Sequence, residues 1–389
     1  MNKQVGNVQL MQKMNRLKVL EFVRRSGEVS RPLIAEKTGL SLASITNITS
    51  YLLERGLLCE SGMEKVGRVG RKSTLLRFCA DRYDLVCVYI NDKFIHVAYT
   101  DLEGNCSEKV RIETNSLDAS QLVETLLESV VAMVSKHEKE RILGVGVAIS
   151  GLVLEDSHLV VSASLKWRSV DIRRLIEEAV NLPVFVDNVS ILKATYYFSK
   201  NMPKEFENMM FVDMENGIGA VQYVSGAVSR STLGEIGHTT VEREGEECFC
   251  GNHGCLEAMC SPARLVSLYQ QHSGTSKNKL CDIENAYRQK EEAARKAVAE
   301  CGKYLGIGLA NLVNLFNPSV FVVDTGDFSE CPSLLTEAES EIRRRAYPAL
   351  TQKLIIRQVK ENENDILRGT AVGLCDRLFD IAFPDNLVE

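Results

Sequence analysis

The sequence lacks long apolar runs, and none of those present reaches the length of a membrane-spanning helix. The N-terminal stretch MNKQVGNVQLMQKMNR lacks the apolar core of a signal peptide. Low-complexity linkers and short internal repeats are also absent. The lack of a spanning-length apolar run and of a signal-peptide core argues against a membrane-spanning or exported chain. We therefore expect a cytoplasmic protein without membrane partners.

The composition is that of an ordinary globular protein. Hydrophobic residues make up 45% and charged residues 25% of the 389 residues, which excludes disordered, collagen-like and coiled-coil chains. This length suffices for two or three domains. Twelve cysteines would suit a disulfide scaffold only in a much shorter secreted chain. Most of them, such as Cys87, Cys301 and Cys375, lie in apolar sequence and are expected to be small buried hydrophobes.

Acidic residues are scarce in the first 80 positions. This segment holds six Glu and no Asp against 14 Lys and Arg, which gives a net charge of +8. The whole chain carries −6, so the remainder carries −14. A basic N-terminal segment joined to an acidic body predicts that only the first part contacts a polyanion.

The basic segment carries three helical patterns, in residues 9–25, 30–39 and 41–56. Ser41 is expected to cap the third helix, and Gly39 is expected to end the second. Three short helices separated by tight Ser and Gly turns are typical of a helix-turn-helix unit.

The third of these helices has one apolar and one polar face. The residues expected to face inward are Leu42, Ile45, Ile48 and Leu52. The residues expected on the opposite face are Ser44, Thr46, Asn47 and Ser50. Small hydrogen-bonding side chains on an exposed helix face can contact base edges in the major groove of DNA.

A basic hairpin follows the third helix. Residues 57–60 and 73–78 are expected to form strands, and the glycine-spaced tip at 67–72 lies between them. The basic side chains of this tip are Arg68, Arg71 and Lys72. Such a tip is typical of the wing of a winged helix-turn-helix, whose arginines enter a minor groove or bind phosphates. We therefore predict that residues 1–80 form a winged helix-turn-helix domain that binds double-stranded operator DNA.

The rest of the chain alternates strands with helices, which predicts a mostly parallel sheet covered on both faces. We expect two α/β lobes of comparable plan. The first covers residues 81–200, with the C-terminal helix of residues 365–389 returning to it, and the second covers 201–364. Helices in the second lobe are expected at 256–271 and 286–316.

Cysteine and histidine gather in one short loop of the second lobe. His238 precedes Cys248 and Cys250 by about ten residues, and Cys255 follows after a Gly-rich turn. Three thiolates and one imidazole form a closed tetrahedral set, the arrangement expected of structural Zn²⁺. Glycines in the turn allow the loop to fold back onto one ion. His253 competes with His238 as the fourth ligand.

The motifs GEIGH and CFCGNHGCLE, together with the predicted winged helix-turn-helix and α/β body, resemble the ROK family of sugar kinases and sugar-responsive repressors. This resemblance covers nearly the whole chain. It implies a two-lobed actin-like ATPase fold with a sugar bound between the lobes. In the family the motif histidine both ligates zinc and lies beside the sugar, which favours His238 over His253.

The resemblance also implies the sugar-binding residues, which are Asn188, Glu235, His238 and Glu257. Carboxylates beside an amide supply directional acceptors and donors for a neutral polyhydroxylated ligand. Zinc would act from behind this set by fixing the loop that carries it.

The positions that the family uses for nucleotide and catalysis differ in this chain. The family's phosphate motif Asp-x-Gly-Gly-Thr corresponds to Tyr-Ile-Asn-Asp-Lys at residues 89–93, where Asp92 would repel a phosphate. The family's catalytic Asn-Asp corresponds to Asn188 and Val189, and valine cannot accept a proton. A one-residue slip in this alignment would restore a base at Asp187. Near the adenosine site, Asp324 and Thr325 replace a Gly-Gly pair.

Binding residues are therefore retained, and catalytic residues are lost. This division predicts a transcriptional regulator, most simply a homodimeric or larger repressor of carbohydrate genes that a sugar or sugar derivative releases from DNA. One alternative is an ATP-dependent sugar kinase with a DNA-binding head. The other is a DNA-bound scaffold that a protein partner controls.

Overall fold

The computed structural model describes residues 2–63, 73–114, 117–154, 158–162, 164–201, 206, 208–215, 217–229 and 235–379. The chain forms two compact units. Unit 1 contains residues 1–161, 169–187 and 367–389, and unit 2 contains 162–168 and 188–366. The helices in the described ranges include none that is both long and apolar enough to cross a membrane.

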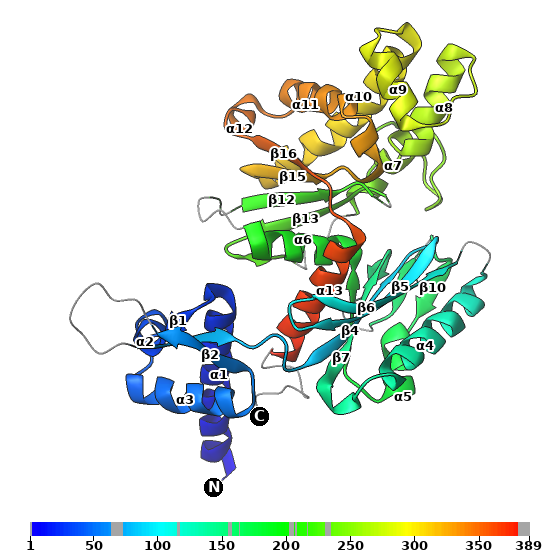
Figure 1. Ribbon diagram of the computed structural model, residues 1–389. Coiled ribbons are helices and arrows are strands. Elements are labelled where there is room, and N and C mark those ends of the chain that lie inside the picture. The colour runs from blue at the N-terminus through cyan, green and yellow to red at the C-terminus, as the bar shows by residue number, and fades with distance from the viewer. Residues whose placement is uncertain are drawn as a thin grey trace. The chain divides into compact units, whose positions relative to one another are not determined.

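The N-terminal part of unit 1 packs three helices against a small sheet (Figure 1). The helices are α1 (Asn2–Ser26), α2 (Arg31–Thr38) and α3 (Leu42–Glu54). The sheet has the order β1-β3-β2, with β1 (Val29–Ser30), β2 (Leu58–Met63) and β3 (Thr74–Phe78) all antiparallel. Ser41 caps α3 by accepting a hydrogen bond from the Ser44 N–H at 3.1 Å, and Gly39 ends α2 with a φ of 73°.

The apolar face of α3 differs from the predicted one. Ile45 and Leu52 are buried, but Leu42 is 53% exposed. Thr49 takes the buried position between Ile45 and Leu52, and its hydroxyl accepts a hydrogen bond from Arg31 Nε at 2.9 Å. The buried stripe of α3 therefore consists of Ile45, Thr49 and Leu52, at positions i, i+4 and i+7. The first turn of the helix lies outside the core.

The larger part of unit 1 is a five-stranded sheet of order β11-β7-β4-β5-β6. Its strands are β4 (Asp84–Ile90), β5 (Phe94–Asp101), β6 (Cys106–Glu113), β7 (Ile142–Ile149) and β11 (Val184–Asn188). β4 is buried along its whole length, as expected of a strand covered on both faces. The helices α4 (Ala119–Ser135) and α5 (Ile172–Val180) lie on one face, and α13 (Glu363–Leu378) lies on the other (Figure 1). A short helix, η1 (Lys139–Arg141), precedes β7, and β8 (Leu152–Val153), β9 (Val160–Ser162) and β10 (Trp167–Val170) form a small separate sheet.

Glycines in β7 and in the turn between β5 and β6 allow α13 to approach the sheet of unit 1 closely. A Cβ atom on Gly146 of β7 would lie 2.7 Å from Thr370 Cγ2, and one on Gly104 would lie 2.6 Å from Arg368 Cα. Either contact would be a clash, so a larger residue at these positions would displace the helix.

Unit 2 is built on a second five-stranded sheet of order β14-β13-β12-β15-β16. Its strands are β12 (Asn208–Asp213), β13 (Gly219–Val224), β14 (Ala227–Val228), β15 (Val320–Asp324) and β16 (Ile355–Val359). β12, β15 and β16 run parallel to one another. One face is covered by α6 (Val189–Asn201), and the other by α10 (Glu292–Phe316) and α11 (Ser333–Arg345) (Figure 1).

The remaining helices of unit 2 correct two sequence predictions. The segment expected as one helix at 256–271 is α7 (Leu256–Met259) and α8 (Pro262–Ser273), because Ser261 caps α8 and Pro262 occupies its first turn. The segment expected from residue 286 is divided between α9 (Leu280–Arg288) and α10, with Lys290 at a φ of 63° between them. The other short helices are η2 (Ile236–His238), η3 (Gly326–Glu330) and α12 (Pro348–Thr351).

Candidate functional site

The four predicted metal ligands come together in unit 2. His238 ends η2, Cys248 and Cys250 lie in the following loop, and Cys255 stands immediately before α7. The ligand atoms of these residues all lie within 4.8 Å of one another. Cys248 Sγ is 3.5 Å from His238 Nδ1, and Cys250 Sγ is 3.7 Å from Cys255 Sγ.

These separations fit a tetrahedral zinc site. With Zn–S near 2.3 Å and Zn–N near 2.05 Å, tetrahedral angles place two sulfurs about 3.8 Å apart and a sulfur and a nitrogen about 3.5 Å apart. Cys248 and Cys255 are buried, and Cys250 is exposed. A hydrogen bond from the Asn252 backbone lowers the pKa of Cys250, whereas burial raises the pKa values of Cys248 and Cys255. Four protein ligands would leave no position on the zinc for a reactive water. The metal would therefore have a structural role, which is to fix the loop that carries its ligands.

Backbone geometry explains the glycines of this loop. Gly251 has a φ of 89° and Gly254 a φ of 65°, values in the left-handed region that favours glycine. A Cβ atom on Gly254 would lie 1.5 Å from the carbonyl oxygen of Glu242. The Gly254 N–H donates to Glu246 O at 2.8 Å, and the Cys248 N–H donates to Asn252 O at 2.7 Å. The loop can therefore close on one ion only with glycine at position 254.

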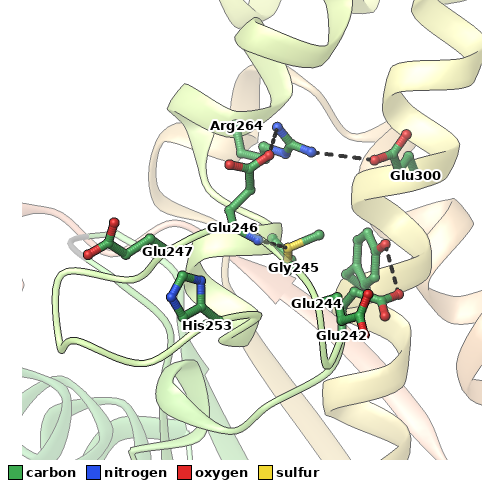
Figure 2. A pocket seen from close by; sticks show the side chains of 10 residues that line it. Glu242, Glu244, Gly245, Glu246, Glu247, His253, Arg264 and Glu300 are labelled. Carbon is green, nitrogen blue, oxygen red and sulfur yellow. Dashed lines mark hydrogen bonds and ion pairs between the residues drawn. The ribbon is translucent and has the colours of Figure 1, made fainter.

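His253 lies outside the group of four. It pairs with Glu247 in an isolated β-bridge and lines a hollow of about 430 Å³ (Figure 2). Five glutamates line this hollow, at positions 242, 244, 246, 247 and 300. Arg264 of α8 bridges two of them, with Glu246 at 2.8 Å and Glu300 at 3.7 Å (Figure 2). These ion pairs connect the loop to α8 and α10.

Two carboxylates accompany the imidazole of His238. Glu235 precedes η2, and Glu257 lies in the first turn of α7. The Glu257 carboxylate accepts a hydrogen bond from the Ile218 N–H at 3.2 Å and lies against Gly217 and Gly237. Burial raises the pKa of Glu257, the hydrogen bond from Ile218 and the charge of His238 oppose this shift, and the charge of Glu235 adds to it. Three of the four predicted sugar-binding residues thus interact, and His238 belongs to both predicted sets.

The fourth predicted sugar-binding residue, Asn188, ends β11. Its side-chain oxygen accepts a hydrogen bond from the Ser190 N–H at 2.8 Å and so caps α6. The Ser190 hydroxyl donates to Asp213 at 2.7 Å, and Gly219 packs closely against it. Asn188 is therefore fixed beside the start of β13. Val189, the next residue, is 5% exposed and opens α6.

The sequence analysis missed a buried lysine and the carboxylates around it. The side chain of Lys193 on α6 is fully buried. Its ammonium nitrogen lies 2.9 Å from Asp213 and 2.9 Å from Asp324, and it also pairs with Glu215. Asp213 and Asp324 are register partners at the carboxyl ends of β12 and β15. A lysine within the apolar stretch of α6 was the available sequence signal, because a charge at such a position requires a partner.

Glu361 adds a pH-sensitive group to this part of unit 2. Burial, together with the neighbouring charges of Asp365 and Asp324, raises the pKa of Glu361 to about 7, and Lys193 opposes this shift. A raised folded-state pKa means that the native protein holds this proton more tightly than the unfolded chain. The resulting stability is present below the ordinary glutamate pKa and is lost as the pH rises through 7.

We therefore expect the unfolding free energy to fall between pH 5 and pH 8 by on the order of 1 kcal/mol through this residue. Urea unfolding across that range measures it. Glu361→Gln should flatten this part of the profile, whereas exposed Glu292→Gln should leave it unchanged. Equal slopes in all three proteins would contradict the assignment.

The predicted DNA-contacting residues of α3 differ in exposure. Thr46, Asn47 and Ser50 are exposed, and Ser44 is half-buried. The Thr46 hydroxyl donates to Leu42 O at 2.8 Å, and the hydroxyls of Ser44 and Ser41 are 2.9 Å apart. The predicted wing residues Arg68, Arg71 and Lys72 lie outside the described residues.

Comparison with known proteins decides the family. A family model described as "ROK family" matches residues 85–375. The chain belongs to the ROK family. The xylose repressor of Bacillus subtilis (strain 168) is similar to this ROK chain at 26% identity, over 97% of this chain and 99% of that protein. The DNA-binding transcriptional dual regulator NagC of Escherichia coli (strain K12) is 28% identical over 90% of each chain.

Solved ROK structures share the fold. A ROK family transcriptional regulator, described as a homolog of the E. coli MLC protein, matches with a TM-score of 0.78 at 22% identity, over 93% of this chain and 96% of that chain. A ROK family glucokinase from Streptomyces griseus matches with a TM-score of 0.62 at 23% identity, over 75% of this chain and 98% of that chain. The α/β body therefore has the actin-like ATPase type of fold that the resemblance implies.

Proposed function

We propose that this protein is a sugar-responsive transcriptional repressor whose binding to operator DNA is relieved by a sugar or sugar derivative. The observation that carries the proposal is that proteins named xylose repressor match 97% and 98% of this chain, a share that includes most of the N-terminal three-helix segment. The glucokinase, in contrast, covers only three quarters of it.

The N-terminal 80 residues are proposed to be a winged helix-turn-helix domain, followed by lobes at 81–200 with 365–389 and at 201–364. The two compact units group some residues differently, since residues 188–201 cluster with unit 2. In the proposed winged helix-turn-helix domain, α3 would enter the major groove of DNA. The basic tip with Arg68, Arg71 and Lys72 would contact the DNA backbone or minor groove. Two heads are needed to bind a symmetric operator, so the acting species is a homodimer or larger.

Two substitutions separate base contacts from phosphate contacts in this domain. Asn47→Ala should lower the affinity for the operator by about 1–3 kcal/mol and leave binding to unrelated duplexes unchanged, because it removes a base contact. Arg71→Ala should weaken binding to every duplex and reduce the slope of log affinity against log salt by about 1. Gel shifts over a salt series with both duplexes measure this. A loss of equal size on both duplexes for Asn47→Ala would remove α3 from sequence recognition.

The effector is proposed to bind through Asn188, Glu235, His238 and Glu257. Two carboxylates, an imidazole and an amide supply acceptors and donors for neighbouring hydroxyls. Relatives named xylose repressor and N-acetylglucosamine repressor point to xylose and N-acetylglucosamine as the first ligands to test. A thermal-shift panel of these sugars, glucose and their phosphate monoesters tests the site, since a ligand at 100 times its Kd adds about 2.7 kcal/mol of stability. Stabilisation by none of them would favour control by a protein partner.

We further propose that the protein is not a sugar kinase. Val189 cannot act as the general base, whose loss typically lowers the rate by about 10²–10⁴. Asp324 stands at the position of the family's Gly-Gly pair and forms an ion pair with Lys193. Burial raises the pKa of Asp324. A coupled ADP-release assay with the same sugars should show no sugar-dependent turnover above background. Turnover that Asp187→Asn abolishes would restore the kinase alternative and place the base one residue earlier.

A further inference from the structure

An aromatic side chain lies exposed within the metal-binding loop of unit 2. Phe249 stands between Cys248 and Cys250 in the sequence and is 62% exposed. In the described part of the chain it is the one phenylalanine that is exposed. A phenyl ring left in water is apolar area that a ligand can cover with a gain in free energy. Single exposed apolar residues are common on protein surfaces, so the neighbours of Phe249 decide what its exposure means.

The backbone holds Phe249 at the tip of a tight turn. The Gly251 N–H donates to Cys248 O at 2.8 Å, which closes a four-residue turn with Phe249 at its second position. The Cys248 N–H donates to Asn252 O at 2.7 Å and ties the base of this turn. Zinc bound to the cysteines on both sides of Phe249 would restrict the turn further. Contact with a ligand would then cost little conformational entropy in this segment.

The ring of Phe249 packs on the imidazole of His238. The two ring centroids are 5.0 Å apart and the planes meet at 86°, an edge-to-face arrangement. Cys248 Sγ lies 3.5 Å from Nδ1 of the same imidazole, so Nδ1 is the ring nitrogen on the side of the metal group. A histidine that binds a metal through Nδ1 carries its proton on Nε2, which donates away from the metal. Phe249 therefore flanks the imidazole that is proposed to donate to the effector.

The other residues proposed to bind the effector supply polar contacts. Asn188, Glu235 and Glu257 all belong to unit 2, as His238 and Phe249 do. A sugar ring carries hydroxyls around its edge and C–H groups on its two faces, so carboxylates, an amide and an imidazole satisfy the edge and leave the faces uncovered. Small-molecule sites combine a few placed polar groups with apolar or aromatic surface. Phe249 provides such a surface next to this polar set.

We propose that Phe249 is a specificity-determining residue that covers one C–H face of the effector, which is therefore a ring-closed pyranose and not an open-chain polyol. This inference rests on the proposed function and names the ligand class of the same site. Because the phenyl and imidazole centroids are 5.0 Å apart, a sugar ring whose hydroxyl accepts from His238 is within van der Waals reach of Phe249. An open-chain polyol offers similar hydroxyls but no flat C–H face.

The first experiment is titration calorimetry with xylose, glucose and N-acetylglucosamine, each beside the open-chain alditol made by reducing it. Wild type should bind at least one of the sugars and bind its alditol more weakly. Phe249→Ala should weaken binding of that sugar by about 3- to 10-fold, the range for one aromatic contact. Phe249→Tyr should stay within about twofold of the wild type, because it keeps the ring.

Metal content and a second aromatic residue separate ligand contact from a structural role. Each Phe249 variant should retain its zinc, because Phe249 contributes no ligand atom. Tyr347→Ala is the matched control, since Tyr347 is 67% exposed at the start of α12 and also belongs to unit 2. This control should bind the sugar as the wild type does.

Proton NMR of the bound sugar tests the contact directly. Protons that lie over the face of a phenyl ring are shifted upfield by its ring current. The C–H protons on one face of the sugar should show this shift in the wild type and lose it in Phe249→Leu, which keeps apolar area but has no ring. The same upfield shifts in Phe249→Leu would show that another group covers the sugar and would overturn the inference.

Failure of the inference and failure of the proposed function give different results. If no sugar of the panel binds the wild type, the proposed function fails and the inference falls with it. If the wild type and Phe249→Ala bind a sugar equally well, or the wild type binds the alditol as tightly as the sugar, the proposed function stands and the inference is wrong. If Phe249→Ala loses zinc and added zinc restores its sugar affinity, Phe249 merely shields the metal loop, which also overturns the inference.

Discussion

Lys193→Met should lower the free energy of unfolding by about 3–5 kcal/mol, the usual effect of removing one partner from a buried ion pair. The Lys193 ammonium is the cation shared by Asp213, Glu215 and Asp324, and both its own side chain and that of Asp324 are inaccessible to solvent. Without it, several carboxylates are left close together, and burial already raises the pKa values of Glu215 and Asp324. The variant must protonate these groups or admit water.

Urea unfolding of the full chain, monitored by hydrogen exchange at the amides of β12 and β15 in unit 2, measures this effect. Lys200→Met on the same helix is the matched control, because Lys200 is exposed and lies over the Tyr196 ring. The control should change stability by less than about 1 kcal/mol. If the two variants lowered the free energy of unfolding by the same small amount, the ion pairs of Lys193 would contribute little to folding.

The second large effect concerns metal. We expect freshly purified protein to contain one zinc per chain and Cys255→Ser to lose nearly all of it, because Cys255 is fully buried within the four-ligand group. Loss of a structural metal removes folding free energy directly, so the melting temperature should fall by roughly 5–10 °C. Mass spectrometry of the intact protein and thermal unfolding with and without a chelator measure both quantities.

Cys281→Ser is the control for this experiment, since Cys281 is exposed on α9 and lies outside the group. It should retain zinc and melt with the wild type. Zinc content that survives Cys255→Ser would contradict the site. Because His238 belongs to both proposed sets, Cys255→Ser should also weaken the sugar response, whereas Glu235→Ala should retain the metal.

Local sequence spacing was sufficient to predict the three cysteine ligands, whereas the choice of His238 over His253 came from the resemblance to the ROK family. Cys248, Cys250 and Cys255 lie within eight positions, and the Gly-rich turn between them permits little other than a closed loop. Ser41 and Gly39 likewise defined the ends of α2 and α3 through their own backbone chemistry. Features of this kind depend on near neighbours and can therefore be recognised in a single sequence.

Features that depend on distant parts of the chain could not be predicted in the same way. Lys193 and Asp324 are separated by 131 positions, and only the pairing of β12 with β15 brings the carboxylates to one lysine. The contact between Arg24 and Asp376 joins positions 352 apart. The exposed Leu42 was misplaced because periodicity alone does not say where a helix leaves the core.

Operator affinity measured with and without sugar, in the wild type and in Glu235→Ala, tests the central proposal most directly. The wild type should lose affinity by a factor within the range of about 5- to 150-fold when the active panel sugar is added. DNA should weaken sugar binding by the same factor, because linkage is reciprocal. Glu235→Ala should bind the operator normally, retain its zinc and stay bound when sugar is added. Release of Glu235→Ala at the wild-type sugar concentration would place the sensing site elsewhere and contradict the account.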